Sequence, residues 1–119
     1  HVISDRYSLS TLAYQQAQGI EVSKLLKMHN GLPIADIIFL VDVPGKIAMK
    51  RMKEDSVRKV EHKFEKNQKF IENLRRNYLG LTDLKKHNIV IIDGTRPIKE
   101  IFEKEVKIAF DMFYKNIYK

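Results

Sequence analysis

Two short apolar runs without polar interruption are the clearest feature of the hydrophobic pattern. They lie in residues 35–43 (ADIIFLVDV) and 88–93 (NIVIID). Such a run, bounded by turn residues, is typical of a strand covered on both faces, as in a parallel sheet. Residues 1–4 (HVIS) have the pattern of the end of a further strand. We therefore predict three strands.

Apolar residues at helical spacing fill most of the remaining chain. The predicted helices cover residues 9–19, 21–29, 44–52, 63–80 and the region after Pro97, whereas residues 53–62 lack an apolar pattern. Alternation of helices with doubly buried strands predicts an α/β fold with an open parallel sheet and helices on both faces. Three strands make an incomplete sheet, so we expect N-terminal strands that this chain lacks.

The composition is that of one folded domain. Charged residues make up 31% of the 119 residues and apolar residues 44%, which is ordinary for a folded protein. The chain has no cysteine, which excludes disulfides, thiol catalysis and Cys-ligated zinc and suits a reducing cytosol. The longest apolar run, Ile37–Val41, is far too short to span a bilayer.

The formal net charge of +7 allows two interpretations. A basic surface can bind nucleic acid through its phosphates. Alternatively, a few cations line a site for small anionic ligands while the others are solvated. The lysines are scattered, and the only crowding of basic residues is in residues 58–69. The four histidines lie far apart in the sequence, so no pair has metal-ligand spacing.

Polar residues follow each predicted strand, at the edge where open α/β sheets bind ligands. They are Asp5-Arg6-Tyr7, then Asp42, then Asp93-Gly94-Thr95-Arg96. Arg6 can grip a phosphate through two parallel hydrogen bonds, or it can pair with a carboxylate such as Asp5. Asp5 can hold a magnesium-bound water, cap a helix or pair with Arg6.

The predicted helix after Arg6 places three polar side chains on one face. Thr11, Tyr14 and Gln15 are at positions i, i+3 and i+4. A hydroxyl, a phenol and an amide together can read a base edge and a sugar. The other interpretation is an ordinary solvated helix face.

Four segments, in order, resemble the thymidylate kinase family. They are VISDRYSLSTLAYQ, ADIIFLVDVPGKIAMKR, KFEKNQKFIENLRRNYLGL and IVIIDGTRPIKEIFEKEV. The resemblance implies a three-layer fold of the P-loop NTPase type, with residues 1–119 as the C-terminal part of a single kinase domain. The motif GxxxxGK[ST] does not occur in the sequence. We therefore expect this chain alone to be inactive.

The resemblance also implies phosphoryl transfer from ATP to dTMP, giving dTDP and ADP. The implied enzyme uses Mg²⁺, is a cytoplasmic homodimer and binds neither nucleic acid nor membrane. Two alternatives stay open: a kinase for another nucleoside monophosphate or a deoxynucleoside, and a non-catalytic basic fragment that binds nucleic acid. Against the second, Phe39, Phe64 and Phe102 occupy core positions in the pattern rather than exposed stacking positions.

Residue by residue, the resemblance implies roles at matching positions. Arg6 contacts the acceptor phosphate, and Asp5 helps to place magnesium. Thr11 and Gln15 lie near the thymine, and Tyr14 packs beside the deoxyribose. A lid at about residues 53–63 carries the cations Arg58, Lys59 and Lys63, which are available to stabilise charge on the phosphates. Lys63 stands where the family often has Arg. The adenine of ATP is flanked by Thr95, Arg96 and Pro97.

Overall fold

The computed structural model describes residues 1–55, 68–84 and 87–118. Within them, β1 (Ile38–Asp42) and β2 (Ile89–Asp93) form a parallel sheet whose register runs from Ile38 opposite Ile89 to Asp42 opposite Asp93. These two strands confirm the prediction made from the two apolar runs. The third predicted strand, at residues 1–4, was wrong, because this segment has no regular structure and no described strand pairs with it.

Seven helical elements surround the strands in the described residues. They are α1 (Ser8–Ala17), α2 (Val22–Met28), α3 (Gly45–Glu54), α4 (Gln68–Leu81), α5 (Ile98–Ile101), η1 (Phe102–Val106) and α6 (Lys107–Ile117). The predicted helices are confirmed, with ends that differ by a few residues. Residues 63–67 of the fourth predicted helix lie outside the described residues. The C-terminal helix contains a π-helical segment, η1, which the apolar spacing did not predict.

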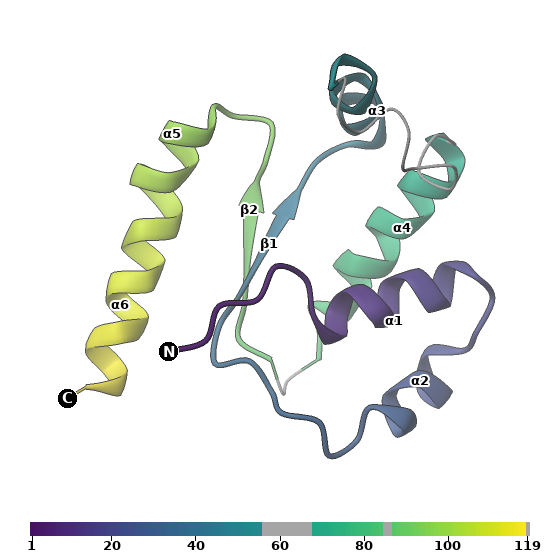
Figure 1. Cartoon of the computed structure of the whole chain (residues 1–119), viewed down its shortest axis with the longest axis horizontal. Coiled ribbons are helices and arrows are strands. Elements are labelled where there is room, and N and C mark those ends of the chain that lie inside the picture. The colour runs from purple at the N-terminus through teal and green to yellow at the C-terminus, as the bar shows by residue number, and fades with distance from the viewer. Residues whose placement is uncertain (56–67, 85–86, 119) are drawn as a thin grey trace.

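The hydrophobic core lies between α1, α2 and α4, which pack together on one side of the strands (Figure 1). Its buried members are Leu9, Leu12, Ala13, Leu25, Leu74 and Leu81. The α1 residues recur at i, i+3 and i+4, so the helix turns one apolar stripe toward α4. This packing fixes the start of α1 against α4 and positions the segment that carries Arg6.

The strands are less covered than the sequence predicted. Val41 is 55% exposed and Ile91 50% exposed, so neither strand is buried on both faces within the described chain. Helix α4 and the run from α5 to α6 lie on opposite sides of the strands (Figure 1). Phe102, expected at a core position, is 54% exposed. Among the described helices, none has both the length and the apolar character needed to cross a membrane.

Candidate functional site

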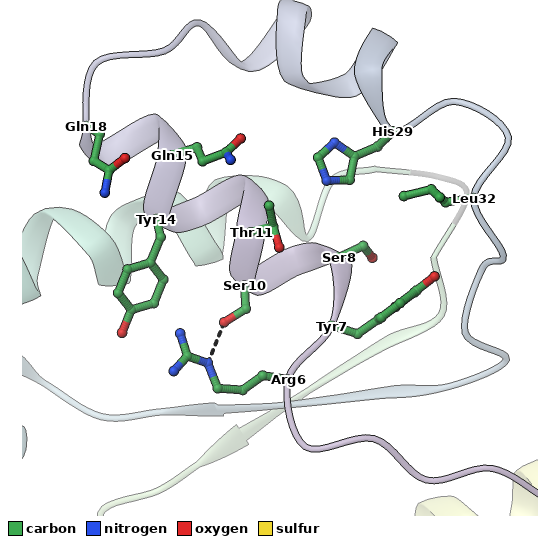
Figure 2. A pocket seen from close by; sticks show the side chains of 10 residues that line it. All are labelled: Arg6, Tyr7, Ser8, Ser10, Thr11, Tyr14, Gln15, Gln18, His29 and Leu32. Carbon is green, nitrogen blue, oxygen red and sulfur yellow. Dashed lines mark hydrogen bonds between the residues drawn. The ribbon is translucent and has the colours of Figure 1, made fainter. Parts of the chain in front are cut away.

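An open cavity of about 640 Å³ lies beside the first turns of α1. The residues that line it are Arg6, Tyr7, Ser8, Ser10, Thr11, Tyr14, Gln15, Gln18, His29 and Leu32 (Figure 2). The helix face predicted from the spacing of Thr11, Tyr14 and Gln15 therefore forms one wall of a cavity, and Arg6 lies at the same cavity. Thus the structure brings together four of the residues predicted to form a site.

The backbone of Arg6 is in an unusual conformation. Its φ angle is 67°, and it is the only non-glycine residue with a positive φ in the described part of the chain. This left-handed conformation costs an L-residue roughly 1–2 kcal/mol, and such strain is concentrated at functional sites. The hydroxyl of Ser4 donates a hydrogen bond to the Arg6 carbonyl oxygen at 2.9 Å and helps to hold the turn.

The guanidinium of Arg6 is held against α1. Its Nε donates a hydrogen bond to Ser10 Oγ at 2.6 Å, and its Cζ lies 4.6 Å from the centroid of the Tyr14 ring. Figure 2 shows the side chain extending along the helix from the turn toward Tyr14. The Ser10 hydroxyl is also hydrogen-bonded to Tyr78 Oη of α4 at 2.5 Å. A fixed cation next to an aromatic ring and polar groups is suited to an anionic ligand with a flat ring.

Asp5 is exposed and precedes Arg6 directly. No group of three or more His, Cys, Asp or Glu residues that could hold a metal ion occurs within residues 1–55, 68–84 and 87–118. A single exposed carboxylate fits Mg²⁺ bound through water or by one ligand, because this ion keeps several waters and rarely occupies an all-protein cage.

A second cavity, of about 530 Å³, lies at the carboxyl ends of the strands. Its lining residues are Asp42, Pro44, Arg75, Ile91, Asp93, Thr95 and Glu105. Arg75 donates from Nε and Nη2 to the two oxygens of Asp42 at 2.8 and 3.1 Å, and from Nη1 to Glu72 at 3.0 Å. The bonds to Asp42 and Glu72 raise the pKa of Arg75 further above its ordinary value. Glu72 also accepts a hydrogen bond from the Gly45 amide at 2.9 Å, which joins the start of α3 to α4.

The loop after β2 is held by short polar contacts. Thr95 donates its amide and its hydroxyl to Asp93 Oδ1 at 3.0 and 2.6 Å, and these bonds lower the pKa of Asp93. Arg51 Nη1 donates to the Gly94 carbonyl at 2.7 Å.

The predicted ATP-side residues are in different surroundings. Thr95 lines the second cavity, Pro97 precedes α5, and the Arg96 guanidinium pairs with Glu105 and, at 3.7 Å, with Glu100. Of the predicted lid at about residues 53–63, Lys53 and Glu54 are in α3. The predicted lid cations Arg58, Lys59 and Lys63 lie outside the described residues.

Sequence reasoning missed several residues of these two sites. Ser10 is four positions after Arg6, but helical spacing does not relate the two residues, because Arg6 precedes α1 and has a left-handed backbone. Tyr78 is 68 residues from Ser10, and Arg75 is 33 residues from Asp42. Contacts of that separation depend on how α4 packs, and no local pattern reveals them.

Comparison with known proteins gives a consistent result. The family model for thymidylate kinase matches residues 1–105. A probable thymidylate kinase of Sulfurisphaera tokodaii is 34% identical over 107 residues, which cover 90% of this chain and 53% of the relative. The thymidylate kinase of Thermosipho africanus is 39% identical over 105 residues, covering 85% and 50%. That of Fervidobacterium nodosum is 38% identical over 111 residues, covering 90% and 54%. The chain spans about half the length of these curated relatives.

Proposed function

The chain belongs to the thymidylate kinase family, and we propose that the complete protein transfers the γ-phosphoryl group of ATP to dTMP. The observation that carries this proposal is the cavity beside α1, where the Arg6 cation lies with Thr11, Tyr14 and Gln15. These groups suit a phosphate, a sugar and a base edge. Residues 1–119 form the C-terminal part of a single kinase domain of the P-loop NTPase type. The half-length match to the relatives supports placing its phosphate loop and further strands elsewhere in that protein.

Four residues of the cavity have a role in binding dTMP. Arg6 binds the acceptor phosphate, which needs a permanent cation with a planar set of donors. Thr11 and Gln15 contact the thymine from the helix face that they share. Tyr14 packs beside the deoxyribose, where its bulk discourages a 2′-hydroxyl.

The reaction needs no general base, because the acceptor is already an anionic phosphate oxygen. That oxygen attacks the γ-phosphorus of ATP, the bond to the ADP oxygen breaks, and the products are dTDP and ADP. Catalysis then consists of positioning and of neutralising negative charge in the transition state. Arg6 supplies part of the positive charge that this neutralisation needs. The predicted lid at about residues 53–63 supplies a further part through Arg58, Lys59 and Lys63.

Family membership also supports the remaining features of the proposal. Asp5 helps to place Mg²⁺, which neutralises phosphate charge when it is bound. Thr95, Arg96 and Pro97 flank the adenine of ATP, and the position of Thr95 in the cavity at the strand ends supports this assignment. The protein acts in the cytoplasm as a homodimer.

A comparison of acceptors tests the proposal. The complete protein, ATP and Mg²⁺ are mixed with dTMP, dUMP, CMP or AMP, and ADP release is followed. We expect the highest kcat/KM with dTMP. A preference for CMP or AMP would exclude the thymine assignment. Tight binding of single-stranded DNA in a filter assay at physiological salt, without turnover of any nucleotide, would exclude the kinase.

A further inference from the structure

We propose that Tyr78, acting through Ser10, is a positioning residue for the Arg6 guanidinium; this inference rests on the proposed function. Three side chains form the chain of contacts. Tyr78 Oη is 2.5 Å from Ser10 Oγ, and Ser10 Oγ accepts the hydrogen bond from Arg6 Nε at 2.6 Å. The chain connects the cavity to α4, although Tyr78 does not itself line the cavity.

The Arg6 side chain needs external support to hold one orientation. It is on the surface, at a residue whose left-handed backbone is unfavourable for an L-residue. A long side chain at such a place has many rotamers, and ordering it opposes binding. The hydrogen bond from Nε and the Tyr14 ring beside Cζ restrict the direction of the guanidinium.

Ser10 is a suitable link because the residue is buried between α1 and α4 while its hydroxyl still contacts Arg6. The residue is 8% exposed and is the only buried polar or charged residue in the described part of the chain. A guanidinium can only donate, so Ser10 accepts from Arg6 and still has a lone pair and a proton for Tyr78. Hydrogen bonds from a charged group are stronger than those between neutral groups. Loss of the tyrosine hydroxyl therefore weakens the restraint on Ser10 and, through it, the restraint on Arg6.

Tyr78 itself is held against the hydrophobic core. Its ring packs against the buried cluster that includes Leu74 and Leu81 on the same helix. The neighbouring Asn77 donates from Nδ2 to the Ala13 carbonyl at 3.1 Å, so α4 is also hydrogen-bonded to the backbone of α1. The helix that supplies the hydroxyl thus cannot easily shift relative to the helix that carries Ser10.

The test uses Tyr78→Phe in the complete protein, which removes one oxygen and keeps the ring in the core. We expect kcat/KM for dTMP to fall about tenfold, the low end for a lost hydrogen bond in a charged network. Ser10→Ala, which breaks the same chain at its middle, should give a similar loss. The matched control is Tyr118→Phe on α6, whose hydroxyl contacts His1, and it should not change kcat/KM.

Two readouts separate positioning of Arg6 from a general structural effect. In an Arg6→Ala background, Tyr78→Phe should cause no further loss of kcat/KM, because the residue that it positions is gone. Calorimetric binding should weaken for dTMP and stay unchanged for thymidine, which has no phosphate. The inference would be overturned if Tyr78→Phe lowered kcat/KM equally in the wild-type and Arg6→Ala backgrounds, or if it weakened thymidine binding. It would also be overturned if Tyr78→Phe and Ser10→Ala both had normal kcat/KM. A wild-type protein that does not phosphorylate dTMP would overturn the proposed function, and the inference with it.

Discussion

Asp42 and Asp93 are register partners at the carboxyl ends of β1 and β2, so two carboxylates meet at one edge of the sheet. Each has its own donor. Arg75 of α4 grips both oxygens of Asp42, whereas Thr95 donates its amide and hydroxyl to Asp93. Because like charges on adjacent strands destabilise a pair, these donors offset the repulsion between the two carboxylates, and Arg75 also connects the sheet edge to α4.

Arg75→Met should therefore destabilise the protein by about 1–2 kcal/mol, since it leaves Asp42 without its two hydrogen bonds. The lower part of the range for charged hydrogen bonds applies because the Arg75 side chain is 30% exposed. Urea unfolding at pH 7 measures the change in free energy. The control is Lys104→Met, because Lys104 is 70% exposed and 3.7 Å from Glu100, and it should cost no more than about 0.5 kcal/mol. Equal losses in the two variants would contradict the prediction.

The pH dependence of stability should report on Glu72. Its pKa is lowered below the ordinary value of 4.5, first by the hydrogen bond from Arg75 and then by the Gly45 amide. A carboxyl group with a lowered folded-state pKa contributes stability above its unfolded pKa, and this contribution is lost as pH falls through the folded value. Glu72→Gln should thus be less stable than wild type at pH 7, with a smaller difference at pH 3. Urea midpoints at both pH values test this, and a difference independent of pH would count against it.

The regular elements of this chain were predictable where one local pattern was enough. The run in residues 35–43 predicts β1 because five consecutive apolar residues bounded by turn residues are typical of a strand, and helical spacing predicts α1 and α4. Residues 1–4 show the limit of such reasoning. Val2 and Ile3 suit a strand, yet they are 96% and 97% exposed, since a strand also needs a neighbour whose backbone it can pair with.

The candidate site was predictable to the extent that it lies on one helix. Thr11, Tyr14 and Gln15 share a face by spacing alone, and that face does line a cavity. Tyr78 and Arg75 reach their sites from α4 through tertiary packing, which residue spacing does not encode. The positive φ of Arg6 was also beyond prediction, because arginine has no preference for that conformation.

Two replacements of Arg6 should separate the effect of its side chain on turnover from the effect of its backbone conformation on stability. Arg6→Ala should lower turnover with dTMP by about two to three orders of magnitude, as expected when one electrostatic contact to a transition state is removed. Arg6→Gly should lower turnover equally but should be about 0.5–1 kcal/mol more stable than Arg6→Ala, because glycine adopts a positive φ without a steric cost. Steady-state kinetics and urea unfolding of the two variants check both parts. Near-normal turnover in Arg6→Ala would remove this residue from the mechanism.

Substitution by alanine should change the free energy of unfolding in opposite directions at two glycines. A Cβ at Gly94 would lie 2.5 Å from Val43 Cγ2 and 2.6 Å from Val41 Cγ1, where the loop crosses the end of β1. Gly80 is in α4, and a Cβ there would meet nothing within 4 Å. Added methyl groups in tightly packed places cost about 1–3 kcal/mol, whereas Gly→Ala in a helix gains roughly 0.5–1 kcal/mol.

Gly94→Ala should therefore lower the free energy of unfolding by about 1–3 kcal/mol, and Gly80→Ala should raise it by about 0.5 kcal/mol. Because Gly94 accepts the hydrogen bond from Arg51 at 2.7 Å, displacement of the loop should also disturb Thr95 and raise the KM for ATP. The KM for dTMP should stay unchanged, since Gly94 does not line the cavity beside α1. Urea unfolding and steady-state kinetics of both variants give the answer. The prediction would be contradicted if both variants lost stability or if only the KM for dTMP changed. Either result would show that crowding at the end of β1 is not the reason for glycine at position 94.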